Sequence, residues 1–169
     1  DGTGTAYEGL DFSGRFIEVE SVPTDYNFAF KNNVITNISE TALDMDYLNA
    51  AYILNNTITD IGYKGIDARN INILEIKSNT VTNITGVLAP KSSETNARSI
   101  AGINVLSVSE TCIEDNLIQN LYSDGIYIYP NIYTSPTLTR EKYSEYLQSI
   151  SITNNEIYDV DDFGIVIHP

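Results

Sequence analysis

Three aspartates and two basic residues in the first half of the chain are of the types that bind cations and form charged contacts. Asp44 and Asp46 are followed 23 residues later by Asp67 and Arg69, and Lys64 lies shortly before Asp67. Carboxylate oxygens are the ligands that Ca²⁺ prefers, so Asp44, Asp46 and Asp67 are candidate metal ligands. The alternative is a solvated surface on which Arg69 and Lys64 form weak ion pairs with these carboxylates.

A repeated asparagine motif indicates how the chain positions these residues. Asn55-Asn56-Thr57-Ile58 recurs in related form four times, with its second Asn at positions 33, 56, 79, 116 and 155. A period in the low twenties, lengthened by insertions, is typical of a solenoid in which each repeat is one coil. Asn side chains stacked on successive coils form a hydrogen-bonded ladder, and Asn tolerates the left-handed backbone of a tight bend. We therefore expect an Asn ladder at one corner of the coil.

Apolar residues recur at fixed distances from each second Asn. In the later repeats a further run reads Gly-Ile-x-Ile, as in Gly125-Ile126-Tyr127-Ile128, or a variant of it, as in Gly65-Ile66-Asp67-Ala68. A spacing of two inside short runs indicates strands with one face inward, and three such strands per turn give a triangular coil. The pattern predicts an all-β solenoid of about five coils. The first three inward columns are Phe30, Ile53, Ile76, Ile113 and Ile152; Ile35, Ile58, Val81, Ile118 and Ile157; and Ile38, Ile61, Ile84, Leu121 and Val160.

Two insertions interrupt the regular coils. The repeats occupy residues 28–169, residues 1–27 are expected to form an irregular coil or cap, and the insertions lie near 86–98 and 130–146. The insertions fall on adjacent coils and flank the Gly-Ile strands from opposite ends. Long insertions in a solenoid tend to gather on its working face, which predicts a groove over the Gly-Ile sheet. The alternative is that they are decorative or pack against a neighbouring chain.

Alternation along the Gly-Ile strands predicts which side chains line this groove. The outward row between the two core positions is Asp44, Asp67, Asn104, Tyr127 and Val166, and the row at the strand end is Asp46, Arg69, Leu106, Tyr129 and His168. Aromatic rings stack on sugar faces, and tyrosines concentrate around the second insertion. The candidates for substrate contacts are Asp67, Asn104, Asp124, Tyr127, Tyr129 and Tyr133. Tyrosines that hold their own loop together would show the same pattern.

A second polar column follows four residues after each second Asn. Its members are Asn37, Asp60, Asn83, Asn120 and Asp159. Their regular recurrence matches the coil period, so we expect them to have a structural role, like the first Asn column.

Composition excludes several partners. The chain has 9 Lys and Arg against 23 Asp and Glu, a formal charge of −14 and a pI near 4.1. Such a surface repels nucleic acid, whose binding depends on Lys and Arg. No apolar run approaches the roughly 18 residues of a membrane-spanning helix, so membrane insertion is not expected. Cys112 is the single cysteine, so no internal disulfide can form.

The repeated Asn-Asn-x-Ile and Gly-Ile-x-Ile runs resemble the right-handed parallel β-helix of the pectate lyase superfamily over about residues 28–169. The resemblance implies an Asn ladder at the turn between the second and third strands, and a substrate groove on the Gly-Ile strand. For a polysaccharide lyase of this group it implies Ca²⁺ bound by aspartates, with Arg69 or Lys64 as the base of a β-elimination. The Asp-Pro-His epimerase motif and the paired-Asp signature of polygalacturonases are absent from the chain.

The leading expectation is a secreted or cell-surface module that binds an extended polysaccharide on the Gly-Ile sheet. The residues leave open whether it also cleaves the polymer as a calcium-assisted lyase. A structural alternative is an adhesin or spike segment whose coils serve only as a scaffold. The chain stops within a strand at Ile167-His168-Pro169, so we expect a continuation, a capping segment or a partner chain at that end.

Overall fold

The computed structural model describes residues 10–13, 27–86, 100–129 and 149–167, and the regular elements in these ranges are strands. They are β1 (Leu10–Ser13), β2 (Asn27–Lys31), β3 (Val34–Ile38), β4 (Thr41–Leu54), β5 (Thr57–Ile61), β6 (Lys64–Lys77), β7 (Thr80–Ile84), β8 (Ala101–Glu114), β9 (Leu117–Leu121), β10 (Asp124–Tyr129), β11 (Ser149–Thr153), β12 (Glu156–Val160) and β13 (Ile165–Ile167). No helix long and apolar enough to cross a membrane occurs in these ranges.

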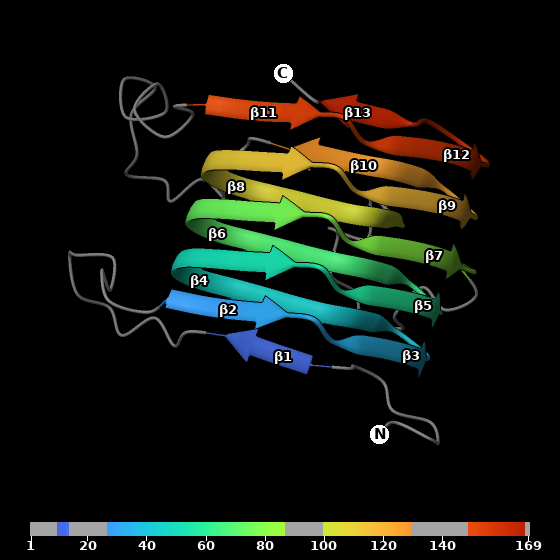
Figure 1. Ribbon diagram of the computed structural model, residues 1–169, viewed down its shortest axis with the longest axis horizontal. Helices are drawn as coiled ribbons and strands as arrows, with labels where there is room; N and C mark the ends of the chain where they lie inside the picture. Colours follow the sequence, from blue (N-terminus) through green and yellow to red (C-terminus); the bar gives the residue numbers. More distant parts are fainter. Residues whose placement is uncertain (1–9, 14–26, 87–99, 130–148, 168–169) are drawn as a thin grey trace, which may run out of the picture.

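Successive coils stack with parallel strand pairing throughout the described ranges (Figure 1). One sheet has the order β1-β4-β6-β8-β10-β13, with β2 paired to β4 and β11 to β8, and the other has the order β12-β9-β7-β5-β3. Each strand therefore pairs with its equivalent one coil away, which is the arrangement of a parallel β-helix. The predicted all-β solenoid is confirmed. β1 lies inside the segment 1–27 that was expected to be irregular, and it adds a parallel strand to the same sheet.

The long strands β4, β6 and β8 each turn a corner of the coil, which the sequence pattern did not predict. Each is 14 residues long and bends at a residue with positive φ: Tyr47 (55°), Asn70 (51°) and Ser107 (55°). Three faces result. The first face is the outer side of β1, β10, β13 and the first halves of the long strands. The second face belongs to the second halves with β2 and β11, and the third face to β3, β5, β7, β9 and β12.

The corner between the second and third faces carries the Asn ladder. Asn56 donates from its backbone N–H and from Nδ2 to Oδ1 of Asn79, both at 2.9 Å, and Asn79 does the same to Asn116 at 2.9 and 3.0 Å. The left-handed residue is the one before the ladder Asn, as in Asn55 (φ 57°) and Asp115 (φ 55°). The ladder hydrogen bonds and the left-handed backbone, both expected of one Asn, thus belong to two neighbouring residues.

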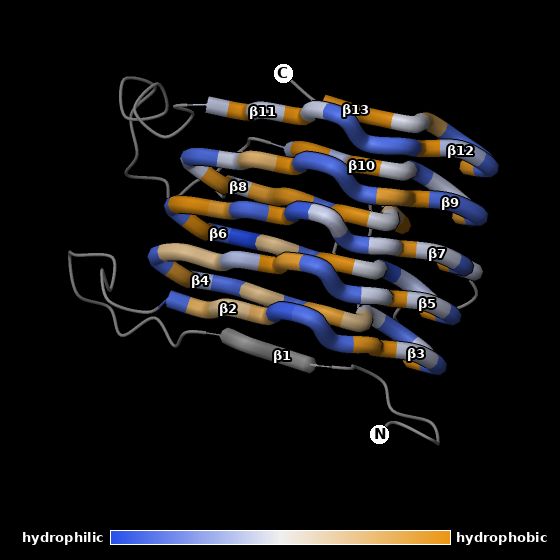
Figure 2. The backbone as a smooth tube through the Cα atoms, in the orientation of Figure 1, coloured by the Kyte–Doolittle hydropathy of each residue, from blue (hydrophilic) through white to orange (hydrophobic). Residues whose placement is uncertain are grey.

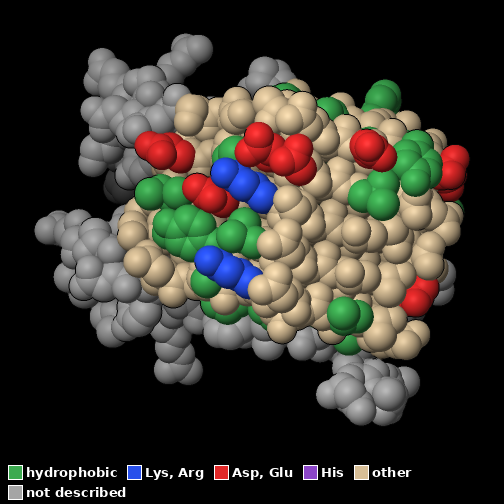
Figure 3. Space-filling view, in the orientation of Figure 1, with side chains coloured by type: hydrophobic (Ala, Val, Ile, Leu, Met, Phe, Trp, Pro, Cys, Tyr) green, Lys and Arg blue, Asp and Glu red, His purple; other side chains and the backbone are tan. Residues whose placement is uncertain are grey.

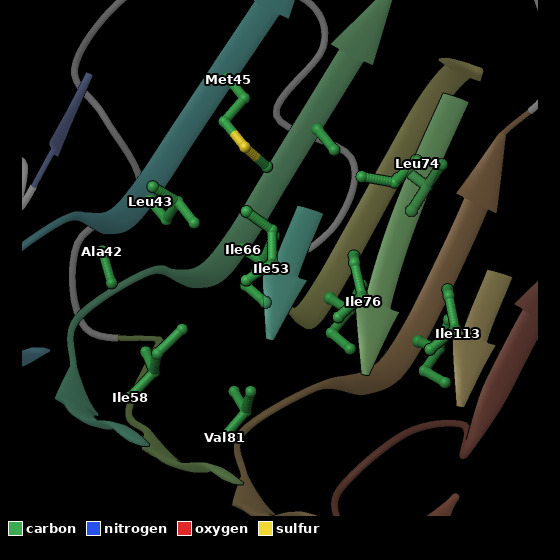
Figure 4. Close-up of a cluster of buried hydrophobic side chains, with 14 of the residues drawn as sticks. Ala42, Leu43, Met45, Ile53, Ile58, Ile66, Leu74, Ile76, Val81 and Ile113 are labelled. Atoms are coloured by element: carbon green, nitrogen blue, oxygen red, sulfur yellow. The ribbon is translucent and has the colours of Figure 1, made fainter. Parts of the chain in front are cut away.

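Apolar columns fill the interior. Ile53, Ile76 and Ile113, from successive coils, point inward in one row, and all three are fully buried (Figure 4). Figure 2 shows the same periodicity as hydrophobic segments that recur at equivalent places in each coil. The predicted inward columns are confirmed. Two further columns were missed, Leu48 with Ile71 and Val108, and Ala51 with Leu74 and Thr111.

The last described coil is open on one side. Ile66, Ile103 and Ile126 are fully buried, whereas Ile165, the next residue in the same column, is 46% exposed. The equivalent core position is therefore partly solvated where no further coil covers it among the described residues. The physical basis is the absence of stacked neighbours, because solenoid coils bury apolar side chains against the coil before and the coil after.

Glycine at the start of the Gly-Ile strands follows from the close stacking of coils. A Cβ at Gly65 would lie 2.5 Å from the carbonyl oxygen of Gly102 and 2.6 Å from Cγ1 of Val81. Neither the backbone nor the buried valine can move aside without disturbing the next coil. The recurring Gly is therefore a packing requirement of the corner that leads into the first face.

Candidate functional site

The register of the first face aligns the outward residues as the sequence predicted. Asp44 pairs with Asp67, Asp67 with Asn104, and Asn104 with Tyr127. In the row at the strand end, Asp46 is followed across the coils by Arg69, Leu106 and Tyr129. The strands keep this register because the insertions lie outside them, and a one-residue slip would turn a whole strand inside out.

A buried ionic network occupies the centre of this face. Lys64 Nζ lies 2.8 Å from Asp67 Oδ2, and Asn104 Nδ2 donates to Asp67 Oδ1 at 2.6 Å. The three residues are 6%, 5% and 1% exposed. Asp67 and Asn104, two of the candidates for substrate contacts, thus present little surface to solvent, and their role in binding stays a prediction. Both carboxylate oxygens of Asp67 are satisfied inside the protein, as a charge removed from water requires.

Beside this network, Arg69 joins two of the other aspartates. Its guanidinium nitrogen Nη2 lies 2.7 Å from Asp44 Oδ1 and 3.9 Å from Asp46 Oδ2. Burial lowers the pKa of Arg69, but the negative charges of Asp67, Asp44 and Asp46 raise it more, and the net pKa lies above that of an ordinary arginine. A guanidinium held this firmly in its charged form is a poor acceptor of a proton. Lys64 Nζ is paired with Asp67 Oδ2 at 2.8 Å.

The residues do not fit the expected calcium site. Among the described residues, no three His, Cys, Asp or Glu side chains form a group that could hold a metal ion. The physical reason is that each carboxylate of the predicted set already has a partner: Asp67 has Lys64 and Asn104, Asp44 has Arg69, and Asp46 accepts a hydrogen bond from Asn70 Nδ2 at 2.8 Å. Arg69 lies between Asp44 and Asp46 and supplies the positive charge that an ion would bring.

Asn70 is a member of this cluster that sequence reasoning missed. It sits at the left-handed corner of β6 and holds Asp46 in place. Burial raises the pKa of the Asp46 carboxyl above its usual value, although the Asn70 hydrogen bond and the charge of Arg69 act in the opposite direction. The signal available in the sequence was an Asn directly after the predicted Gly-Ile strand, a residue type that favours left-handed corners.

The aromatic end of the face is only partly accessible. Tyr127 is 7% exposed, and Tyr129 is half-buried. Asp124 is 7% exposed and accepts a hydrogen bond from the backbone N–H of Phe163 at 3.2 Å. Tyr133, His168, the segment 87–98 and the insertion near 130–146 lie outside the described residues. Solvent reaches Asp44 and Val166, which are half-buried, and a row of half-buried residues at the strand ends. This row is here called the strip: Asp46, Arg69, Leu106 and Tyr129.

The coil geometry and the comparison with protein-family models agree on the fold. A family model described as a right handed beta helix region matches residues 17–169. The chain belongs to the right-handed β-helix family. The expected handedness is thereby confirmed together with the parallel coils. Neither the comparison with curated proteins nor that with solved structures gave a match. The family model begins at residue 17 and so includes part of the segment 1–27.

Proposed function

We propose that this β-helix is an extracellular or cell-surface module that binds a neutral polysaccharide along the strip and does not cleave it. The observation that carries the proposal is the register of the strip. Carboxylate, guanidinium, aliphatic and phenol groups follow one another on four neighbouring coils. Parallel strands repeat every ~4.8 Å, so the strip presents its groups at even intervals to an extended chain.

Binding is favoured over cleavage because the groups that would perform a β-elimination are already paired. Arg69 and Lys64, the two candidate bases, are held in ion pairs of 2.7 and 2.8 Å. A hydrolase of the inverting type needs two carboxylates roughly 6.5–9.5 Å apart that are free to act as acid and base. Asp44 and Asp67 stand directly opposite each other on adjacent strands, and each has a cationic partner.

A neutral polymer is favoured over a uronic acid polymer on electrostatic grounds. The chain carries a formal charge of −14, and the basic residues of the first face are neutralised by aspartates. The second face has the same character. Figure 3 shows carboxylates gathered beside a basic side chain there, and Lys77 lies 3.4 Å from Glu75 and 3.7 Å from Glu114. A polyanion would be repelled by this field. In a neutral polymer the sugar hydroxyls can donate to carboxylates, and the apolar face of a sugar ring can stack on tyrosine.

A structural scaffold is the second candidate, and one observation favours it. The network of Lys64, Asp67 and Asn104 is buried, and both oxygens of its carboxylate have partners within the chain. A network of this kind requires no ligand and stabilises the coil stack by itself. In a scaffold, as in an adhesin or spike segment, the strip would have no binding role.

Affinity electrophoresis separates these possibilities. The protein is run through gels that contain a mixed-linkage glucan, a galactomannan, an arabinoxylan, polygalacturonate or alginate. We expect retardation by at least one neutral polymer and none by the two uronates. Tyr129→Ala should weaken retardation by about two- to tenfold, because an aromatic stack contributes about 0.5–1.5 kcal/mol. Tyr52→Ala is the matched control, since Tyr52 is half-buried on the second face.

Three outcomes contradict the proposal. If none of the polysaccharides retards the protein, binding is contradicted and the structural scaffold remains as the function. If Tyr129→Ala and Tyr52→Ala reduce the retardation equally, the strip is not the binding surface. The appearance of unsaturated uronate absorbance on incubation with polygalacturonate or alginate, with or without Ca²⁺, would identify a lyase instead.

A further inference from the structure

A hollow on the third face is not part of the strip. It has a volume of about 720 Å³ and lies where β5, β7, β9 and β12 end (Figure 1). One wall is the second polar column from Asp60 to Asp159, and the other consists of residues that follow the strands, among them Tyr122 and Asp161. The sequence assigned this column a structural role. The hollow shows that four of its members also line an open surface.

The hydrogen bonds of the column run in one direction. Asn120 Nδ2 donates to Asn83 Oδ1 at 2.6 Å, and Asn83 Nδ2 donates to Asp60 Oδ1 at 2.9 Å. Each Asn side chain thus donates its amide N–H to the coil before and points its oxygen, an acceptor, toward the coil after. Asp159 follows Asn120 one coil later. Among the described residues, nothing donates a hydrogen bond to Asn120 Oδ1 or to the Asp159 carboxylate.

An exposed aromatic ring lies at the same end of the hollow. Tyr122 is 59% exposed and lines the hollow, so its ring is accessible to a ligand there. Gly86 provides the space for it: a Cβ at Gly86 would strike the Tyr122 ring, and the φ of +66° there also favours glycine. The ring therefore rests against bare backbone beside the unmatched acceptors.

We propose that this hollow binds a short neutral saccharide, which stacks an apolar ring face on Tyr122 and donates hydroxyl hydrogen bonds to Asn120, Asp159 and Asp161. Acceptors predominate there, because neither Asn120 Oδ1 nor the Asp159 carboxylate receives a hydrogen bond among the described residues, and hydroxyl donors of a ligand would complement them. Asp60, Asp159 and Asp161 repel an anion. A metal ion is disfavoured because no group of three suitable side chains converges among the described residues. The site lies on a different sheet from the strip and does not depend on it.

The test uses the whole chain with small neutral probes. Cellotriose, maltotriose, xylotriose, mannotriose and lactose are titrated by saturation-transfer difference NMR. We expect at least one probe to bind, and Tyr122→Ala to weaken it by about three- to tenfold. Asp159→Asn, which keeps a residue that tolerates the left-handed backbone, should weaken it by about threefold. The control is Tyr158→Ala, because Tyr158 is 46% exposed on β12 but does not line the hollow.

The outcomes separate this site from the proposed polysaccharide strip. Loss of probe binding in Tyr122→Ala, together with probe binding retained in Tyr129→Ala, supports the hollow as the site. This result does not depend on whether affinity electrophoresis detects polysaccharide binding by the strip. If no probe binds, or if Tyr158→Ala weakens binding as much as Tyr122→Ala, the inference is wrong. Displacement of the bound probe by hexalysine at equal concentration would assign the hollow to a cationic peptide instead. Unfolding midpoints of all variants are measured first, and Asp159→Asn, at an exposed position, provides the test if Tyr122→Ala does not fold.

Discussion

Asn56 and Asn79 lie 23 residues apart and are joined by two hydrogen bonds of 2.9 Å that converge on the same oxygen, Asn79 Oδ1. Asn79 Nδ2 in turn donates to the backbone oxygen of Ile53 at 2.8 Å and to Asn116 Oδ1 at 3.0 Å. Asn79 is 1% exposed, so water cannot substitute for these bonds. Each ladder residue thus links its own coil to the coil before and the coil after.

Replacement of Asn79 by Ala should therefore be strongly destabilising. It leaves the backbone N–H of Asn56 without its acceptor and the Ile53 carbonyl without its amide donor, and each buried unsatisfied group costs about 1–3 kcal/mol. Asn56 Nδ2 loses one of its two acceptors and still donates to the backbone oxygen of Phe30 at 2.9 Å. We expect a loss of about 3–5 kcal/mol in the free energy of unfolding, measured by urea titration. Asn33→Ala is the control, because Asn33 is exposed and no described residue donates a hydrogen bond to its side-chain oxygen, so no ladder acceptor is lost. Equal losses in the two variants would contradict this account of the ladder.

The pair Lys64–Asp67 predicts a non-additive response. Lys64→Met leaves the Asp67 carboxylate buried without its cation, which costs about 3–5 kcal/mol in comparable sites. Asp67→Asn in the same chain removes the charge and should recover most of that loss. A double-mutant cycle by urea unfolding measures the coupling.

The control for this cycle is Lys77→Met on the second face. Lys77 forms pairs of 3.4 and 3.7 Å with Glu75 and Glu114, but its side chain is 32% exposed. We expect its unfolding midpoint to remain close to that of the wild type. If Lys64→Met behaves in the same way, the buried network contributes little to stability.

Thr111 presents a hydroxyl to the core without a partner. It is 3% exposed, its Oγ1 makes no hydrogen bond, and the preceding residues of its column are Leu74 and Ala51. Thr111→Val removes the unsatisfied oxygen at nearly constant volume and should stabilise the protein by about 1 kcal/mol. Thr82→Val is the matched comparison, since Thr82 Oγ1 donates to Thr59 Oγ1 at 3.0 Å. That variant should lose about 0.5–1.5 kcal/mol, and thermal unfolding distinguishes opposite signs directly.

Asp46 predicts a pH dependence. Burial raises its pKa in the folded state above the unfolded value of 3.8, so folding favours the protonated form. The stabilising contribution of this group is present below pH 3.8 and is lost as the pH rises through the raised folded pKa. Asp46→Asn should therefore be more stable than the wild type at pH 7, and the difference should vanish at low pH. Urea midpoints of both proteins between pH 3 and 7 measure this, and a difference that grows on acidification would contradict it.

Much of the architecture could be predicted from the recurrence of Asn and Ile. The register of Asp44 with Asp67 and of Asp46 with Arg69 was predicted because coils of equal length place equivalent residues side by side. The bends at Tyr47 and Ser107 were not predictable from residue preferences, because these residue types are not typical of left-handed backbone. The hollow beside Tyr122 was missed for another reason: a periodic polar column gives no sign of whether the surface beside it is flat or recessed.

The sequence by itself determined the coil, its Asn ladder and the order of side chains along each face, because all three follow from a fixed repeat length and strict alternation. Only the tertiary structure decided the state of those side chains. It placed Lys64 and Asp67 in a buried ion pair and set Arg69 between Asp44 and Asp46. It also left the oxygen of Asn120 unmatched at an open hollow. The physical reason is that burial and hydrogen bonding depend on distances between coils and on what covers each face. A linear pattern of residue types does not contain those distances.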